Sequence, residues 1–293
     1  MSVSETGLHT RFRSLYRRSL PGFRVNEDCA GLLGSHAWVA DGATGVSDRR
    51  IETAPSDAAW LAAAIQEGLP SLLQAGRGAG DPLHELQAII ARRYEAAAGQ
   101  GPHSPTEAGP SACLGLIGVE EAAGRGRLRL TGRFLGDVVA LVPSDGEVLR
   151  WTDERAKPFE RLTLAALGEG GSAAGVVPEP VRRQIVENRA RLNSPGGYWV
   201  VNPLRPWAGR ELRFSAQLEP GAPVVLATDG FMRLVDVFGA YTDRSLHAAL
   251  AAGRGDDLFD ELRERELHDD AGRSFRRVKI HDDATVLVVA AEG

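Results

Sequence analysis

The sequence predicts an α+β fold in which β-sheets are covered by helices. Two observations support this prediction: short apolar runs bounded by turn residues recur along the 293-residue chain, and helical segments come in pairs. Continuous apolar runs between turn residues are typical of strands that are buried on both faces. A regular alternation of strands and helices would indicate a doubly wound parallel sheet, so the pairing of helices favours the α+β class.

Seven short segments have the composition of buried strands. The stretch "VVALVPSDGEVLRW" contains two β-rich runs around Ser-Asp-Gly, which predicts a hairpin that reverses at residues 144–146. The predicted strands are residues 37–40, 113–119, 127–130, 138–142, 147–151, 223–228 and 285–291.

Five segments have helical periodicity. The first two are alanine- and leucine-rich amphipathic stretches, and the breaker run "QAGRGAGDP" separates them. The Gly/Pro/Ser-rich stretch 96–112 predicts a surface loop, but too few strands flank it to build two separate cores. We therefore expect one domain over residues 1–293, with residues 1–22 as an N-terminal extension. The predicted helices are residues 56–73, 81–98, 179–192, 243–253 and 255–270.

Composition limits the partners and the compartment. The chain is 43% hydrophobic and 25% charged, as in soluble globular proteins, and its net charge of −5 provides no general attraction to nucleic acid or anionic membrane. No apolar stretch approaches the ~20 residues that span a bilayer, and no apolar segment of a secretory signal follows the N-terminal arginines. Two cysteines, Cys29 and Cys113, are too few for a disulfide framework, so we expect a reducing cytoplasm.

An acidic residue follows an apolar run in "HAWVADGATG", where the predicted strand leads to Asp41 and Gly42 follows at once. Asp-Gly pairs commonly close turns, so this motif alone is weak. Three further motifs place acids beside apolar strands, and a carboxylate there is costly unless it is paired or bound to a metal. They are "FRVNEDCAG" with Glu27 and Asp28, "PVVLATDGF" with Asp229, and "VKIHDDATVLVV" with Asp282 and Asp283.

The chemistry that such acids serve is the binding of hard cations. Mg²⁺ and Mn²⁺ prefer oxygen ligands and suit sites made of a few carboxylates and water. Two such ions ~4 Å apart lower the pKa of a shared water enough for it to attack phosphorus near neutral pH. A glycine after the acid lets a backbone carbonyl reach a metal without a side chain in the way.

Six short motifs occur in the order found in a known family. They are "RVNED", "VADGATG", "PSACLGLIGV", "GDVVALV", "LATDGF" and "DDATVLVV". In this order the chain, from about residue 24 to 289, resembles the metal-dependent serine/threonine protein phosphatases of type 2C, and it looks like a bacterial member. The resemblance implies a sandwich of two antiparallel sheets with helices on both outer faces, and metals at one end. Residues 155–210 or so would form the variable flap of the family.

The resemblance also implies the roles of individual residues. Asp41 would bridge two Mn²⁺ or Mg²⁺ ions and Asp229 and Asp282 would complete one of them, while Glu27 and the carbonyl of Gly42 would help hold the other. A metal-bound water would attack phosphoserine or phosphothreonine in a partner protein.

The residue expected to hold the substrate phosphate is Arg24, because an arginine offers two parallel donors to an oxyanion. The family often has this arginine four residues before the glutamate, whereas Arg24 lies three before Glu27. Arg18, or an arginine of "RSFRRVK" at residues 273–279, is the alternative.

Two further positions depart from the family pattern. Ala43 stands where eukaryotic members carry a histidine after the first Asp-Gly, so that proposed acid for the leaving group is missing; His36 and His281 lie near the motifs in sequence. Arg233 stands where the family frequently has an acid that is associated with a third metal. Asp137, the other residue of that site, is retained. Because the acid is missing, we expect no strong third metal site. Arg233 would then contact the substrate phosphate or pair with Asp236.

Three aromatic residues of the flap-like region, Tyr198, Trp199 and Trp207, are expected either to line a substrate groove or to pack in the core. Three functions remain open: a cytoplasmic protein phosphatase, a non-catalytic module that binds a phosphoprotein, and a phosphatase of a small phosphorylated metabolite.

Overall fold

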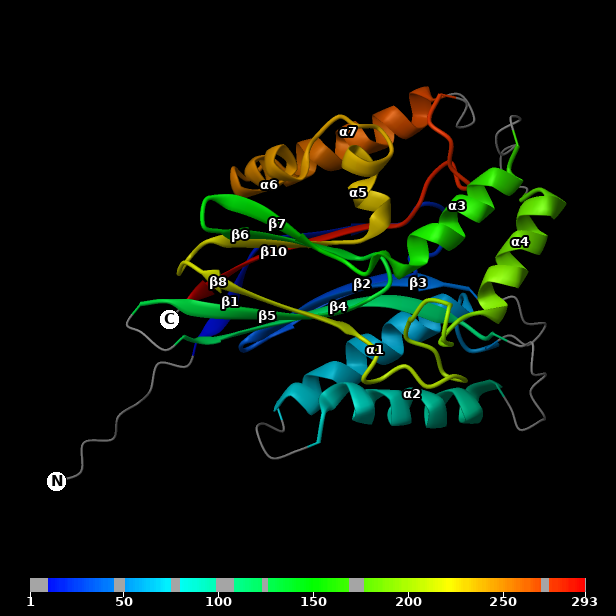
Figure 1. The fold of residues 1–293 in the computed structure, drawn as a ribbon, viewed down its shortest axis with the longest axis horizontal. Helices are drawn as coiled ribbons and strands as arrows, with labels where there is room; N and C mark the ends of the chain where they lie inside the picture. The colour runs from blue at the N-terminus through cyan, green and yellow to red at the C-terminus, as the bar shows by residue number, and fades with distance from the viewer. Residues whose placement is uncertain are drawn as a thin grey trace.

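Two five-stranded antiparallel sheets pack face to face at the centre of the protein, and helices cover both outer sides (Figure 1). The structure is a computed structural model, and it describes residues 10–44, 51–74, 80–98, 108–122, 126–168, 177–269 and 274–292. The predicted α+β sandwich is therefore confirmed. None of the helices in these ranges combines the length and the apolarity that a membrane span needs.

The first sheet has the strand order β1-β10-β9-β6-β7. Its interior strand β10 is buried along almost its whole length because it is apolar on both faces. One face packs on the other sheet, and the other face packs on three helices (Figure 1). The strands are β1 (Arg11–Leu20), β6 (Val139–Ser144), β7 (Glu147–Trp151), β9 (Pro223–Ala227) and β10 (Ala284–Glu292), and the helices are α5 (Asp229–Asp236), α6 (Asp243–Ala251) and α7 (Gly255–His268).

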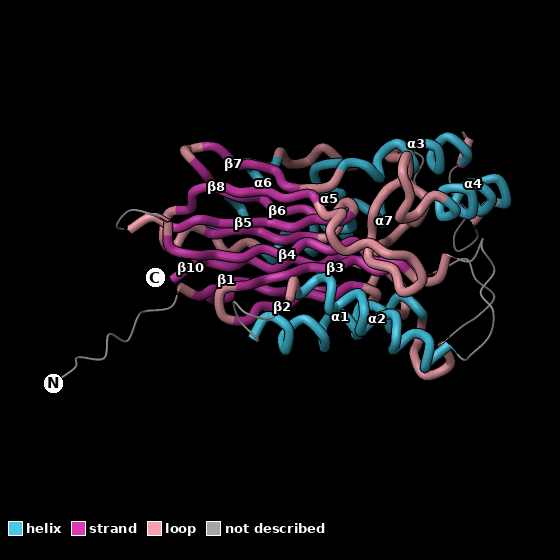
Figure 2. Tube along the Cα trace, turned by 60° about the horizontal axis from the view of Figure 1, so that its bottom comes forward, coloured by secondary structure: helices cyan, strands magenta, loops and turns pink. Residues whose placement is uncertain are grey.

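The second sheet has the strand order β2-β3-β4-β5-β8. Two long antiparallel helices cover its outer face through a core that contains Trp38 and Trp207 (Figure 2). Its strands are β2 (Asp28–Leu33), β3 (His36–Ala43), β4 (Ser111–Glu121), β5 (Leu128–Leu135) and β8 (Leu212–Leu218), and the helices are α1 (Asp57–Gln74) and α2 (Pro82–Ala98).

The alternation of side chains along β3 determines where its acid lies. Ala37 and Val39 face the core between the sheets, whereas Trp38 and Ala40 face α1 and α2. Because successive residues of a strand point to opposite faces, Asp41 continues the row that faces the space between the sheets. The strand therefore carries an acid out of the core at one end of the sandwich.

Two further helices lie beyond that end, at the right of Figures 1 and 2. They are α3 (Lys157–Ala166), which follows the short 3₁₀ helix η1 (Glu154–Ala156), and α4 (Glu179–Ala190). Both belong to the region expected as the flap. The sequence predicted only α4; the "KP" at the start of α3 looks like a break, but a proline in the first helical turn leaves no hydrogen bond unmade.

The expected N-terminal extension is wrong for the residues described. Arg11–Leu20 forms β1, which pairs with β10 from Arg11↔Glu292 to Leu20↔Ala284. The strand escaped prediction because it lies at the sheet edge and is mostly polar, with Phe12 as its buried residue. The edge strand β8 escaped prediction for the same reason, and β2 and α5 are short. Most of the expected loop 96–112 lies outside the described residues.

Candidate active site

The three aspartates predicted to act together meet at one end of the sandwich. Asp41 lies near the end of β3, Asp229 opens α5 directly after β9, and Asp282 lies just before β10. All three line one cavity of about 260 Å³ together with Gly42 and Asp137. Residues 241 positions apart in the sequence thus line one cavity.

The glycines that follow two of these acids allow close approach of the backbone. The Gly42 amide donates to the carbonyl of Glu27 at 3.0 Å, and a Cβ on Gly42 would lie 2.5 Å from that oxygen. A Cβ on Gly230 would lie 1.9 Å from the carbonyl of Asp283. Each Asp-Gly pair therefore brings two acidic motifs together, Asp41 with the Glu27 motif and Asp229 with the Asp283 motif.

Asp28, Asp41 and Asp229 form a group of half-buried carboxylates. None of them makes an ion pair among the described residues, although the charge of Arg233 acts to lower the pKa of Asp229. Asp28 stands opposite Asp41 in the β2–β3 register, and its Oδ1 is buried without a hydrogen-bond partner. Burial, then the charges of Asp28 and Asp229, raise the pKa of Asp41 well above its ordinary value. Burial and the charges of Asp137 and Asp282 raise the pKa of Asp229 to about 6, and burial raises the pKa of Asp28 to about 8.

Asp282 lies in the opposite electrostatic environment. Burial alone would raise the pKa of Asp282, but the charges of Lys279 and Arg233 lower it. Lys279 Nζ lies 2.8 Å from Asp282 Oδ1, and Arg233 Nη2 lies 2.7 Å from Oδ2. The expectation that Arg233 pairs with Asp236 is wrong, because Asp236 pairs with Arg150.

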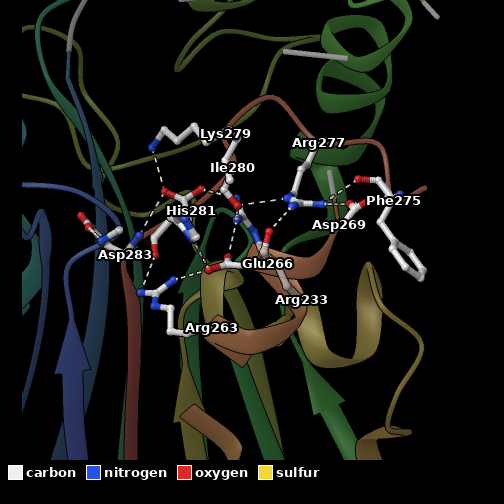
Figure 3. A network of polar contacts seen from close by, with 12 residues as sticks. Arg233, Arg263, Glu266, Asp269, Phe275, Arg277, Lys279, Ile280, His281 and Asp283 are labelled. Carbon is white, nitrogen blue, oxygen red and sulfur yellow. Dashed lines mark hydrogen bonds and ion pairs between the residues drawn. The ribbon is translucent and has the colours of Figure 1, made fainter. Parts of the chain in front are cut away.

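A polar network around Glu266 holds this arrangement, and Figure 3 shows Arg233, Arg263 and His281 pointing toward Glu266. The buried carboxylate of Glu266 on α7 accepts hydrogen bonds from Arg233 at 2.7 Å and Arg263 at 2.6 Å, and it lies 2.9 Å from His281 Nδ1. Arg263 also donates to the carbonyl of Asp282 at 2.9 Å. We call Arg233, Arg263, Glu266, His281 and Asp282 the Glu266 network.

Glu27 and Arg24 line a second cavity of about 240 Å³ beside the first. Asp282 and Lys279 line both cavities, so the two adjoin. Glu27 Oε1 accepts hydrogen bonds from Thr44 at 2.9 Å and Ser56 at 2.6 Å. The Arg24 guanidinium lies over the ring of Phe23, 5.3 Å from its centroid, and Arg24 is not among the residues that line the Asp41 cavity.

Neither histidine of the acid motifs lines the Asp41 cavity. His36 begins β3 and lies five residues, or about 17 Å of extended strand, before Asp41. Burial lowers the pKa of His36. His281 belongs to the Glu266 network.

The aromatic residues of the flap-like region divide between the two predicted roles. Tyr198 lines the Asp41 cavity and packs on Phe159 with ring centroids 4.9 Å apart. Trp207 is fully buried in the core under α1 and α2, and Trp199 packs against the same core.

The two cysteines are free, and burial raises the pKa of the Cys29 thiol to about 12. An inert filler role therefore fits Cys29.

Sequence reasoning gave no role to three charged side chains of the cavity: Glu160 on α3, Arg189 on α4, and Lys279. Partial burial and the neighbouring charge of Asp137 raise the pKa of Glu160 to about 8. Lys279 lies in the acidic motif "VKIHDDATVLVV", which assigns it no role, and no motif marked Glu160 or Arg189. The positions of all three depend on how α3, α4 and the loop before β10 fold back over the strand ends.

The donor set suits hard divalent cations, since it consists of carboxylates and backbone carbonyls. The Asp28 Oδ1 atom lacks a hydrogen-bond partner, and the raised pKa values of Asp41 and Asp229 show that their ionised forms are disfavoured in this site. A bound cation would favour those ionised forms. Within the described ranges, no group of three or more acidic, histidine or cysteine side chains has the close spacing of a complete ligand shell. The acids around this cavity therefore fit the role of ligands to such ions, and water molecules would complete the coordination.

Several solved structures are similar to this protein over nearly the whole chain. The chain is similar to MsPP, a PPM Ser-Thr phosphatase of Mycobacterium smegmatis in complex with cacodylate, with 17% identity, coverage of 97% and 98% of the two chains, and a TM-score of 0.52. It is similar to Stp1 of Staphylococcus aureus at 15% identity, 98% and 96% coverage and a TM-score of 0.52. The PstP catalytic domain with two manganese ions matches at 18% identity, 97% and 100% coverage and a TM-score of 0.50.

No protein-family model and no curated sequence matches the chain. The likeness therefore concerns the fold, over nearly the full length of both chains. This protein has the fold of the PPM serine/threonine phosphatases, the family whose motif order its sequence resembles.

Proposed function

We propose that this protein is a metal-dependent phosphatase that hydrolyses phosphoserine and phosphothreonine in proteins. The observation that carries the proposal is the convergence of Asp41, Asp229 and Asp282 on one cavity at the end of a PPM-type sandwich. Two Mn²⁺ or Mg²⁺ ions, when bound, would lower the pKa of water and offset the charge of the phosphate. The PstP domain of the same fold holds two manganese ions, which supports this choice of cofactor.

The candidate metal ligands line the two adjoining cavities, and each ion would have its own set of ligands. Asp41 would be shared by both ions, because it faces the space between the sheets beside Gly42. Asp229 and Asp282 would serve one ion, and Glu27 with the Gly42 carbonyl would serve the other, since Gly42 is hydrogen-bonded to Glu27. These roles are those that the family resemblance implied.

Other residues hold the ligands in place. The Glu266 network fixes Asp282 from behind, and Lys279 holds its other oxygen. Phe159 and Tyr198 form an aromatic wall of the cavity, which excludes water from that side of a bound phosphoryl group. Because Ala43 offers no acid to the leaving group, we expect its proton to come from water.

Hydrolysis of p-nitrophenyl phosphate, with and without Mn²⁺, tests the proposal. We expect turnover that depends on Mn²⁺ and falls at least about a hundredfold in Asp229→Asn, because the substitution removes a ligand charge from the site. Asp260→Asn, at an exposed position of α7, is the matched control and should retain full activity. Turnover that persists in a chelator contradicts the two-ion assignment.

One observation favours a second candidate, a non-catalytic module that binds phosphoproteins. Asp282 is already neutralised by Arg233 and Lys279, and Arg233 stands where the family carries an acid. Thermal unfolding with and without Mn²⁺ separates the two: an ion that binds the folded protein at a hundred times its Kd stabilises it by about 2.7 kcal/mol. Absence of this stabilisation, together with phosphopeptide binding, favours the module. Comparison of phosphopeptides with sugar phosphates separates protein from metabolite substrates.

A further inference from the structure

Arg189 on α4 is a cation of the Asp41 cavity that lacks a carboxylate partner among the described residues. Its hydrogen bonds are long: Nη1 lies 3.5 Å from the Ala43 carbonyl and 3.4 Å from Ser111 Oγ. A guanidinium has five N–H donors, so most of its donor capacity is unspent. Keeping a partly buried guanidinium without a partner of opposite charge costs free energy, and a bound anion would remove this cost.

The contacts of Arg189 place its charge beside the acids. Ala43 lies two residues after Asp41 on β3. Ser111 on β4 is the partner of Ala43 in the β3–β4 register. The guanidinium therefore lies at the strand ends from which Asp41 enters the cavity. Asp41 and Arg189 both line this cavity, so an oxyanion there can contact Arg189 while its other oxygens face the carboxylate side, where the ions would lie.

Two neighbouring side chains hold the helix that carries Arg189. Asn188 donates to the Phe159 carbonyl and to Thr163 Oγ1, both at 2.9 Å, and so ties α4 to α3. Arg205 donates to the carbonyls of Arg189, Ala190 and Leu192 at 3.3, 3.0 and 3.0 Å, and so caps the end of α4. Arg189 is thus positioned before any ligand arrives, which reduces the entropy lost on binding.

The arginines expected from the sequence to hold phosphate are engaged elsewhere. Arg18 pairs with Asp256 at 2.9 Å, and Arg277 forms a buried pair with Asp269. Arg276 donates to two carbonyls at the end of α3. Arg24 stacks on Phe23 in the neighbouring cavity. Arg273 lies outside the described residues.

We propose that Arg189, rather than Arg24, binds the phosphoryl group of the substrate through two parallel N–H donors. The inference rests on the proposed function and assigns its substrate-binding residue. Arginine suits this task because its planar fork matches two oxygens of a phosphate, whereas lysine offers only a point charge. The substrate-binding arginine then comes from the flap-like region instead of the first acidic motif.

Titration of the Mn²⁺-loaded protein with inorganic phosphate, followed by calorimetry, tests the inference without turnover. We expect Arg189→Gln to weaken phosphate binding at least about tenfold, as loss of a charged hydrogen-bond pair does, and Arg189→Lys to weaken it less. Arg24→Gln should change the affinity less than about twofold. Arg182→Gln, which removes an exposed arginine of the same helix, is the matched control and should also leave it unchanged.

Kinetics with p-nitrophenyl phosphate provide a second readout. If Arg189 binds the phosphoryl group, Arg189→Gln raises KM, and thermal unfolding shows a folded protein. A purely structural role would lower the melting temperature in Arg189→Gln and leave the phosphate affinity of the folded Arg189→Lys variant unchanged, which overturns the inference. Loss of phosphate binding in Arg24→Gln, with Arg189→Gln unaffected, also overturns it.

The two proposals fail in different ways. A wild-type protein that binds phosphate through Arg189 but hydrolyses no phosphoester contradicts the proposed function and retains the binding site. A wild-type protein that hydrolyses phosphoesters with a phosphate affinity insensitive to Arg189 overturns the inference alone. Absence of any phosphate binding by the Mn²⁺-loaded wild type overturns the inference as well.

Discussion

Asp41 and Asp282 line the same cavity, yet their carboxylates lie in opposite environments. Asp41 is surrounded by Asp28, Asp137 and Asp229, and burial with these charges raises its pKa. Asp282 is held between Lys279 and Arg233, whose charges lower its pKa against the effect of burial. On one side of the site the surroundings therefore disfavour ionised carboxylates, while on the other side two cations of the protein favour an ionised carboxylate.

The comparison teaches how to separate a candidate ligand group from a structural network. In the Glu266 network every charged side chain has a partner of opposite charge, as expected of groups that stabilise a fold. The carboxylates around Asp41 make no ion pair in the described parts of the chain and repel one another. A bound proton or a bound cation would relieve this repulsion. The lack of ion pairs, more than the number of acids, distinguishes the side of the site where we propose that ions bind.

The largest expected effect comes from Asp41→Asn. We expect activity at saturating Mn²⁺ to fall at least about a hundredfold, which is about 2.7 kcal/mol of transition-state stabilisation. We also expect the metal-free variant to be at least as stable as the wild type, because the substitution removes a buried charge that its neighbours repel. Urea unfolding in a chelator measures this second effect. A destabilised metal-free variant would show that the carboxylate is balanced after all.

Glu266→Gln tests the Glu266 network, in which the charges are paired. We expect the free energy of unfolding to fall by about 3 kcal/mol, because Arg233 and Arg263 lose the charge that partners them in a buried site. The exposed Glu264 of the same helix provides the control, and Glu264→Gln should change stability little. Urea unfolding measures both variants. Equal stabilities for the two would remove the distinction between a structural network and a ligand group.

The smallest expected effect is a change in acid sensitivity at Asp269, whose carboxylate forms a buried pair with Arg277. Although burial opposes it, the hydrogen bonds and charge of Arg277 lower the pKa of Asp269. A carboxyl whose pKa is lower in the folded state stabilises the protein above its unfolded pKa of ~3.9, and this contribution is lost as the pH falls through its folded pKa. Asp269→Asn should therefore be less stable at pH 7 and lose less stability between about pH 4 and pH 2. Urea unfolding across this range measures the slope, and parallel slopes in both proteins would rule out this contribution.

The central strands and the acids could be predicted from sequence because both depend on local pattern. The buried strands β4, β9 and β10 are continuous apolar runs, and Asp41 and Asp229 follow such runs directly. The edge strands β1 and β8 could not be predicted in this way, because a strand that faces water on one side needs few apolar residues. They pair with β10 and β5, which lie far from them in the sequence.

By itself, the sequence determined the class of fold and which strands have acids beside them, since continuous apolar runs and the acids next to them are properties of a few neighbouring residues. The tertiary structure alone decided which cations meet those acids. Arg233 reaches Glu266 across 33 positions and Asp282 across 49, and Arg189 reaches Ala43 across 146. Charges this far apart in the chain interact only after packing brings them within a few ångströms and excludes the water that would screen them.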